Sequence, residues 1–78
     1  MSRKQYVVTL TPDERESLIR LVSAGKVSAQ SLTRARILLK ADASPQGPGW
    51  DDARIAEAFE VSVSTVERVR QRFTKRGP

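Results

Sequence analysis

The chain has 78 residues, with 14 Lys and Arg, 9 Asp and Glu, and neither cysteine nor histidine. A chain of this length forms a single small domain, and the lack of cysteine excludes disulfides and thiolate-bound zinc. The absence of histidine removes the commonest general base and metal ligand. No apolar run is long enough to span a bilayer and the start is too polar for a signal peptide, so we expect a cytoplasmic domain without a membrane partner.

The net charge of +5 is concentrated in a few segments of the chain. Residues 61–78 hold five Lys and Arg against one acid, Glu67, and the first ten residues hold Arg3 and Lys4 with no acid. Residues 44–60 are acidic on balance. Localised positive charge is typical of proteins that bind a polyanion, most often nucleic acid. The alternative is surface charge that only keeps the protein soluble.

Residues 1–10 are predicted to be an extended basic arm, in which "QYVVTL" forms an extended lead-in or a single edge strand. The next residues predict a helix start. Thr11 suits the N-cap, Pro12 the first helical position, and Glu14 the return bond of a capping box. Gly25 suits the end of this helix.

A second helix is predicted to begin after Ser28, since this residue suits the N-cap. Val27 and Leu32 occupy the positions of a hydrophobic staple around it. Residues 11–43 thus hold the first two helices. The stretch "SPQGPG" contains two prolines and two glycines, so residues 44–50 are predicted to be a loop.

Two further helices follow with only a short break between them. Asp51 suits the N-cap of the third helix and Ser62 that of the fourth. Trp50, at the entry to the third helix, is predicted to plug the core rather than to stack on a base. Two helices joined by a tight turn form a helix-turn-helix, which we place at residues 51–75.

The residues of this pair have the sizes that a helix-turn-helix needs. Ala56 is small where the two helices approach, Val61 can plug the turn, and Val66 and Val69 can point inward. Glu60 occupies the turn position where glycine is usual, and we expect it to adopt a left-handed conformation. The predicted fold is therefore all-α, with about four helices in one domain at residues 1–78. Its predicted core comprises Leu18, Leu21, Leu32, Leu39, Ile55, Ala56, Phe59, Val61, Val66, Val69 and Phe73.

The outer face of the fourth helix is predicted to enter the major groove of double-stranded DNA, where side chains read base edges. Arg70 is expected to pack its stem or to pair with Glu67 rather than to contact a base. The expected base contacts are Val63, Ser64, Thr65 and Arg68. The expected phosphate contacts are Ser62, Gln71, Arg72, Lys75, Arg34, Arg3 and Lys4.

The stretches "LTPDERESLIRLVSAGK", "LTRARILLKAD" and "DARIAEAFEVSVSTVERVRQRF" resemble, in order and spacing, the N-terminal segment of bacterial insertion-sequence transposases of the mariner-related superfamily, of the insertion sequence six-thirty type. The resemblance implies a homeodomain-like helix-turn-helix that recognises the terminal inverted repeats of a transposon. In that family a catalytic domain with three acidic metal ligands follows. It is missing here, so we expect no enzyme, cofactor, metal or small-molecule ligand in this chain.

Other classes of protein remain open from the sequence. A stand-alone transcriptional regulator can use the same fold, and it would be expected to form a homodimer on a palindromic site. A protein-interaction module could use the basic helix to bind an acidic partner. An enzyme is disfavoured because histidine, cysteine, a paired-acid pocket and a phosphate-binding loop are all missing.

Overall fold

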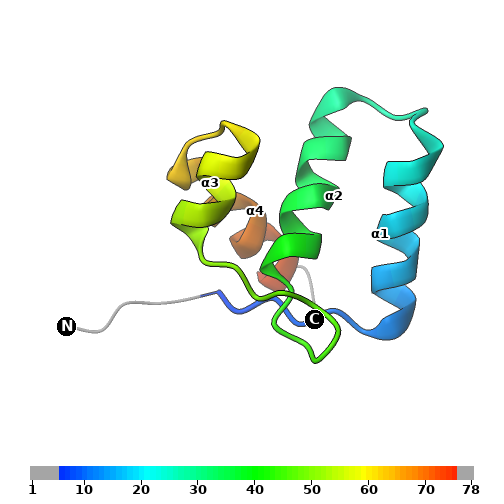
Figure 1. Ribbon diagram of the computed structural model, residues 1–78, viewed down its shortest axis with the longest axis horizontal. Helices are drawn as coiled ribbons and strands as arrows, with labels where there is room; N and C mark the ends of the chain where they lie inside the picture. Colours follow the sequence, from blue (N-terminus) through cyan, green and yellow to red (C-terminus); the bar gives the residue numbers. More distant parts are fainter. Residues whose placement is uncertain (1–5, 76–78) are drawn as a thin grey trace.

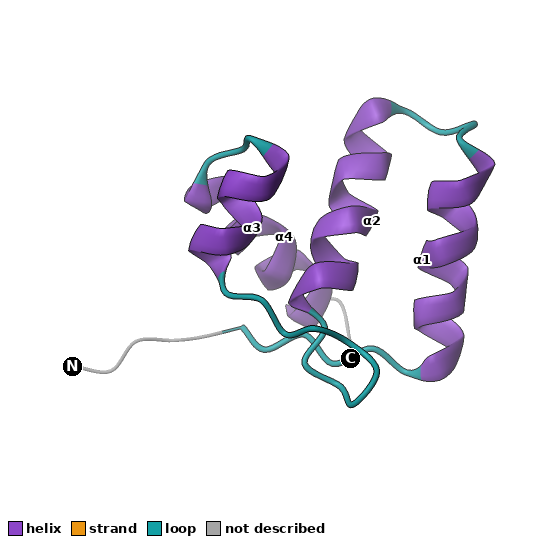
Figure 2. Cartoon of the chain, in the orientation of Figure 1, coloured by secondary structure: helices purple, strands orange, loops and turns teal. Residues whose placement is uncertain are grey.

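The computed structural model describes residues 6–75, which form four helices joined by loops. These are α1 (Pro12–Ala24), α2 (Ala29–Ala41), α3 (Asp52–Phe59) and α4 (Val63–Lys75). Figure 2 shows no strand in this part of the chain, so the stretch before α1 is an extended lead-in and not an edge strand. The all-α, four-helix prediction is confirmed.

Side chains cap the starts of the helices where the sequence predicts them. Thr11 and Glu14 form the full capping box, with N–H to side-chain oxygen distances of 2.9 and 3.1 Å. Asp51 accepts a bond of 2.9 Å from the backbone N–H three residues further on, and Ser28 and Ser62 each accept one of 3.2 Å. These bonds satisfy N–H groups that have no partner within the helix.

The second helix is central to the fold. It contacts α1, α3 and α4, whereas α1 contacts no helix but α2. Figure 1 shows α1 and α2 side by side, with α3 and α4 on the other side of α2 and the segment before α1 running beneath them. The buried core comprises Val8, Leu10, Ile37, Leu38, Ala41, Ile55, Ala56, Val66 and Val69.

The predicted core is correct for the helix-turn-helix but incomplete elsewhere. Leu21 and Leu32 are only half-buried and lie outside the core cluster. Leu21 belongs to α1, which packs on one helix alone and buries none of its residues fully. Leu32 lies in the first turn of α2, before the buried residues of that helix. Val8 and Leu10, which the sequence places in an arm, are 0% and 4% exposed. Most of residues 6–10 is therefore part of the folded domain. The other predicted core residues outside the buried set pack on it half-buried: Leu18, Leu39, Phe59, Val61 and Phe73.

The tryptophan at the entry to α3 packs against the core, as predicted. Its ring is flanked by two cations, with Lys40 Nζ 4.7 Å and Arg54 Cζ 4.2 Å from the ring centroid. The loop that precedes it is fixed to the end of α2 by the bond from Trp50 N–H to the Lys40 carbonyl oxygen. Trp50 thus joins α2 to α3.

A fully buried carboxylate joins the first part of the chain to α2. Asp42 accepts hydrogen bonds from Leu10 N–H (3.0 Å), Ser44 N–H and Oγ–H (both 2.9 Å), and Arg15 Nη1 (2.9 Å). Burial by itself raises the pKa of Asp42, but these hydrogen bonds outweigh it and hold the pKa below its usual value. Gly47 packs so closely on this residue that an added Cβ would overlap it.

We predict that Asp42→Asn lowers the free energy of unfolding at neutral pH by about 2–3 kcal/mol, because it removes an ionised acceptor from several buried donors. A carboxyl whose pKa is depressed by folding stabilises the protein above its unfolded pKa. That contribution is lost as the pH falls through the folded pKa. Urea unfolding of both proteins at pH 7 and pH 3 should therefore give a smaller difference at pH 3. An equal difference at the two pH values would contradict this role of the carboxylate.

One arginine of α4 is bound within the protein. Arg70 Nε pairs with the carboxylate of Asp52, while Nη1 and Nη2 donate to the carbonyl oxygens of Tyr6 (3.2 Å) and Trp50 (3.0 Å). Its side chain is only 14% exposed. The expectation that Arg70 does not face a base is consistent with these contacts, but its partner is Asp52 and not Glu67. On α4, Glu67 lies near the solvent side, whereas Arg70 faces the start of α3.

We predict that Arg70→Ala lowers the free energy of unfolding by about 2 kcal/mol or more, since it leaves a half-buried carboxylate and two carbonyl oxygens without their donor. Arg20→Ala is the matched control. It breaks the exposed pair with Glu16 on α1 and should change stability by less than about 0.5 kcal/mol. Denaturant unfolding measures both. Similar small losses in the two variants would show that the Arg70 contacts contribute little.

Candidate nucleic-acid interface

The turn between α3 and α4 has the geometry expected of a helix-turn-helix. Glu60 adopts the left-handed conformation, with φ 56° and ψ 46°. The N–H of Val61 then donates to the carbonyl oxygen of Ala56 (3.0 Å), and the Val61 side chain packs on the core. Ala56 is itself buried, and its small side chain lets α4 pack against α3 at this point.

One side of α4 is buried and the other is exposed. Val66 and Val69 are 0% and 9% exposed, and half-buried Phe73 continues the same side. At 100° per residue, Ser64 and Arg68 lie on the opposite side, and both are exposed. This is the face that the sequence predicts to be free.

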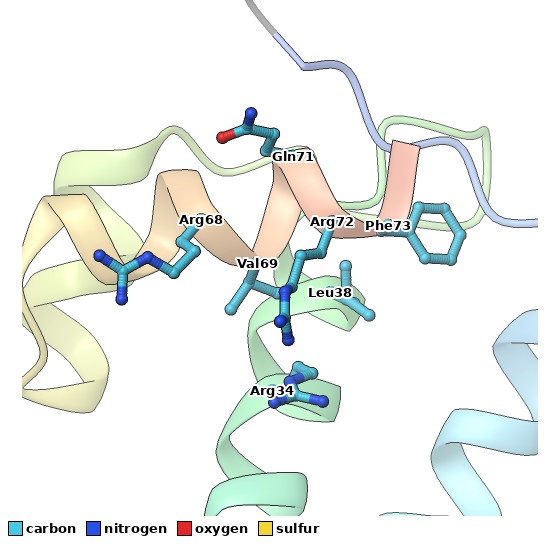
Figure 3. A pocket seen from close by; sticks show the side chains of 7 residues that line it. All are labelled: Arg34, Leu38, Arg68, Val69, Gln71, Arg72 and Phe73. Atoms are coloured by element: carbon cyan, nitrogen blue, oxygen red, sulfur yellow. The ribbon is translucent and has the colours of Figure 1, made fainter. Parts of the chain in front are cut away.

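Not all of the predicted contact residues share that face. Thr65 and Arg72 lie on the side of α4 that faces α2, and Thr65 is half-buried. Figure 3 shows Arg72 extending from α4 toward Arg34 of α2, while Gln71 points away from α2. The predicted contact residues of α4 are therefore spread over two sides of the helix. Arg34 and Arg72 lie in the part of the site between α2 and α4. Arg68 lies where this part meets the outer face of α4.

The structure describes only some of the remaining predicted contact residues. Ser62 acts as the helix cap, and its hydroxyl also lies 3.0 Å from that of Thr65. Val63 is 43% exposed in the first turn of α4. The side chain of Lys75 lies outside the described residues, as do Arg3 and Lys4.

Two polar residues of α2 that the sequence analysis missed also line the site. Gln30 and Thr33 border a hollow that Thr65 and Arg68 line from α4. Gln30 lies one helical turn before Arg34, and Thr33 lies one turn before Ile37. This spacing is the only signal in the sequence that could have placed them in the site. Their side chains supply hydrogen-bonding groups beside the arginines.

Within residues 6–75, the arginines of this region are not neutralised by an ion pair. The described side chains form three ion pairs, Arg15–Asp42, Arg20–Glu16 and Arg70–Asp52. None involves Arg34, Arg68 or Arg72. Across residues 6–75 there is also no cluster of three His, Cys, Asp or Glu side chains able to hold a metal ion. The chemistry available here is hydrogen bonding and charge pairing with an anion.

A comparison with known families matches residues 28–78 to the homeodomain-like domain, which covers α2, α3 and α4. No curated protein and no solved structure matches the chain significantly. No helix in the described range is both long and apolar enough to cross a membrane. Small all-helical domains of this type are typical of DNA binding rather than catalysis. Since the match spans well over half of the sequence, the chain belongs to the homeodomain-like helix-turn-helix family.

Proposed function

We propose that this domain binds double-stranded DNA in a sequence-specific manner, with α4 inserted in the major groove. The observation that carries the proposal is the division of the α4 arginines. Arg70 is bound to Asp52 and two carbonyl oxygens, whereas Arg68 and Arg72 have no ion pair within the described residues. An α-helix fits the major groove, and its exposed side chains can reach base edges there.

The same geometry suggests how the contacts are divided. Arg68 lies on the outer face of α4, and its guanidinium can donate two hydrogen bonds to a guanine. Ser64 lies one turn earlier on that face, and Val63 and Thr65 flank it at the start of the helix. Phosphate contacts are proposed for the residues around this face, which hold the helix in place without reading sequence. They are Ser62, Gln71, Arg72, Lys75, Arg34, Arg3 and Lys4.

We further propose that the natural target is the terminal inverted repeat of a transposon, and that the domain serves as the DNA-binding part of a transposase. The support is the resemblance of "LTRARILL" and "VSVSTVERVRQRF" to insertion-sequence transposases, together with membership of the homeodomain-like family. Selection from random duplex DNA identifies the preferred site. The proposal expects that site in inverted repeats on both sides of the gene, whereas a single site at a promoter would favour a regulator.

We predict that Arg68→Ala weakens binding to the selected duplex by about 1–3 kcal/mol, because it removes a paired hydrogen bond to a base. Binding to a scrambled duplex should change much less. Arg20→Ala removes the same charge from α1 and should have little effect on either duplex. Fluorescence anisotropy titrations of the three proteins with both duplexes provide the measurement. Equal losses on the two duplexes for Arg68→Ala would show that this residue does not read sequence.

A further inference from the structure

An open groove of about 680 Å³ lies between α2 and the C-terminal half of α4. Leu38 of α2 and Val69 of α4 are buried at its floor, and half-buried Phe73 lines one end. Arg34 of α2 and Arg72 of α4 extend into it from opposite walls (Figure 3). Arg68 lines the same groove, which we call the α2–α4 groove.

Among the residues that the structure describes, the charged groups that line this groove are all positive. No carboxylate lines it, and neither Arg34 nor Arg72 takes part in an ion pair within the described residues. Two guanidinium groups that converge from facing helices repel each other unless an anion lies between them. Guanidinium groups bind phosphate with two parallel hydrogen bonds, so a phosphate group matches both the charge and the donors.

The position of the groove beside α4 indicates where such a phosphate would come from. A helix with its side chains is about 10–12 Å wide, close to the roughly 12 Å width of the major groove of DNA. When a helix fills that groove, its flanks therefore lie against the two sugar–phosphate strands. Arg72 is on the flank of α4 that faces α2, one turn after Arg68. The strand on that side would run past the α2–α4 groove.

We propose that the α2–α4 groove holds one phosphodiester of the bound duplex between Arg34 and Arg72, with Leu38 and Phe73 against the adjoining deoxyribose. The proposal rests on the DNA binding proposed above and deepens it, since it assigns Arg34 and Arg72 to one shared phosphodiester. Because Arg34 and Arg72 come from different helices, a phosphate between them fixes α4 along the groove of the DNA. It thus sets which bases Arg68 can reach.

Arg34→Gln tests this proposal, and Arg36→Gln is its matched control. Both residues are exposed on α2, but Arg36 lines a different hollow with Arg15 and Phe59, about 200° around the helix. We expect Arg34→Gln to weaken binding to the selected duplex about tenfold, because one charge-assisted hydrogen-bonded contact is lost. The slope of log binding constant against log salt concentration should become less steep by about one. We expect less than a twofold effect from Arg36→Gln.

Neutral methylphosphonate linkages, placed one at a time in the selected duplex, identify the phosphate. At one linkage, the replacement should weaken binding by the wild-type protein several-fold and leave binding by Arg34→Gln unchanged, since that variant has already lost the contact. Equal losses for Arg34→Gln and Arg36→Gln, or no linkage with this behaviour, would overturn the proposal while leaving DNA binding intact. A wild-type protein that binds no duplex would refute the proposed function itself.

Discussion

The contacts of Arg70 hold the helix-turn-helix in one position relative to the rest of the chain. Its guanidinium bonds to the first residue of α3, to the loop carbonyl just before α3 and to the segment that precedes α1. Two separate stretches of sequence, the segment before α1 and the start of α3, thus meet at a single side chain of α4. The orientation of α4 depends on this contact, and so does everything that its outer face can reach.

The division of the arginines follows from helical geometry. Arg70 lies near the buried side of α4 and is neutralised by Asp52, whereas Arg68 and Arg72 lie toward solvent and toward α2. One helix therefore contains both a structural cation and cations left for a partner. Asp42 serves the other end of the fold in a similar way, because its carboxylate binds α1, the segment before it and the loop after α2. Asp42 and Arg70 thus connect separate parts of the fold, whereas Arg68 and Arg72 are exposed and have no ion pair within the described residues.

Local signals in the sequence were sufficient for much of this fold. Capping residues such as Thr11 and Asp51 act within three residues of themselves, so the helix starts could be predicted. The turn at Glu60 could be predicted for the same reason. The bonds of Asp42 to Leu10 and of Arg70 to Tyr6 span 32 and 64 residues, and no local pattern reveals them. For the candidate site, periodicity predicted the exposure of Arg68, but only the packing of α2 beside α4 brings Arg34 and Arg72 to one groove.

The most direct test of this account is a titration of the ¹⁵N-labelled protein with its selected duplex, followed through the backbone amide resonances. We expect the largest shift changes at Ser64 and Arg68 on α4 and at Arg34 on α2. The amides around Ile19 should change little, because α1 contacts only α2 among the helices and lies apart from α4 in the fold. The largest changes on α1, with those of α4 unaffected, would contradict the assignment of α4 as the DNA-binding helix.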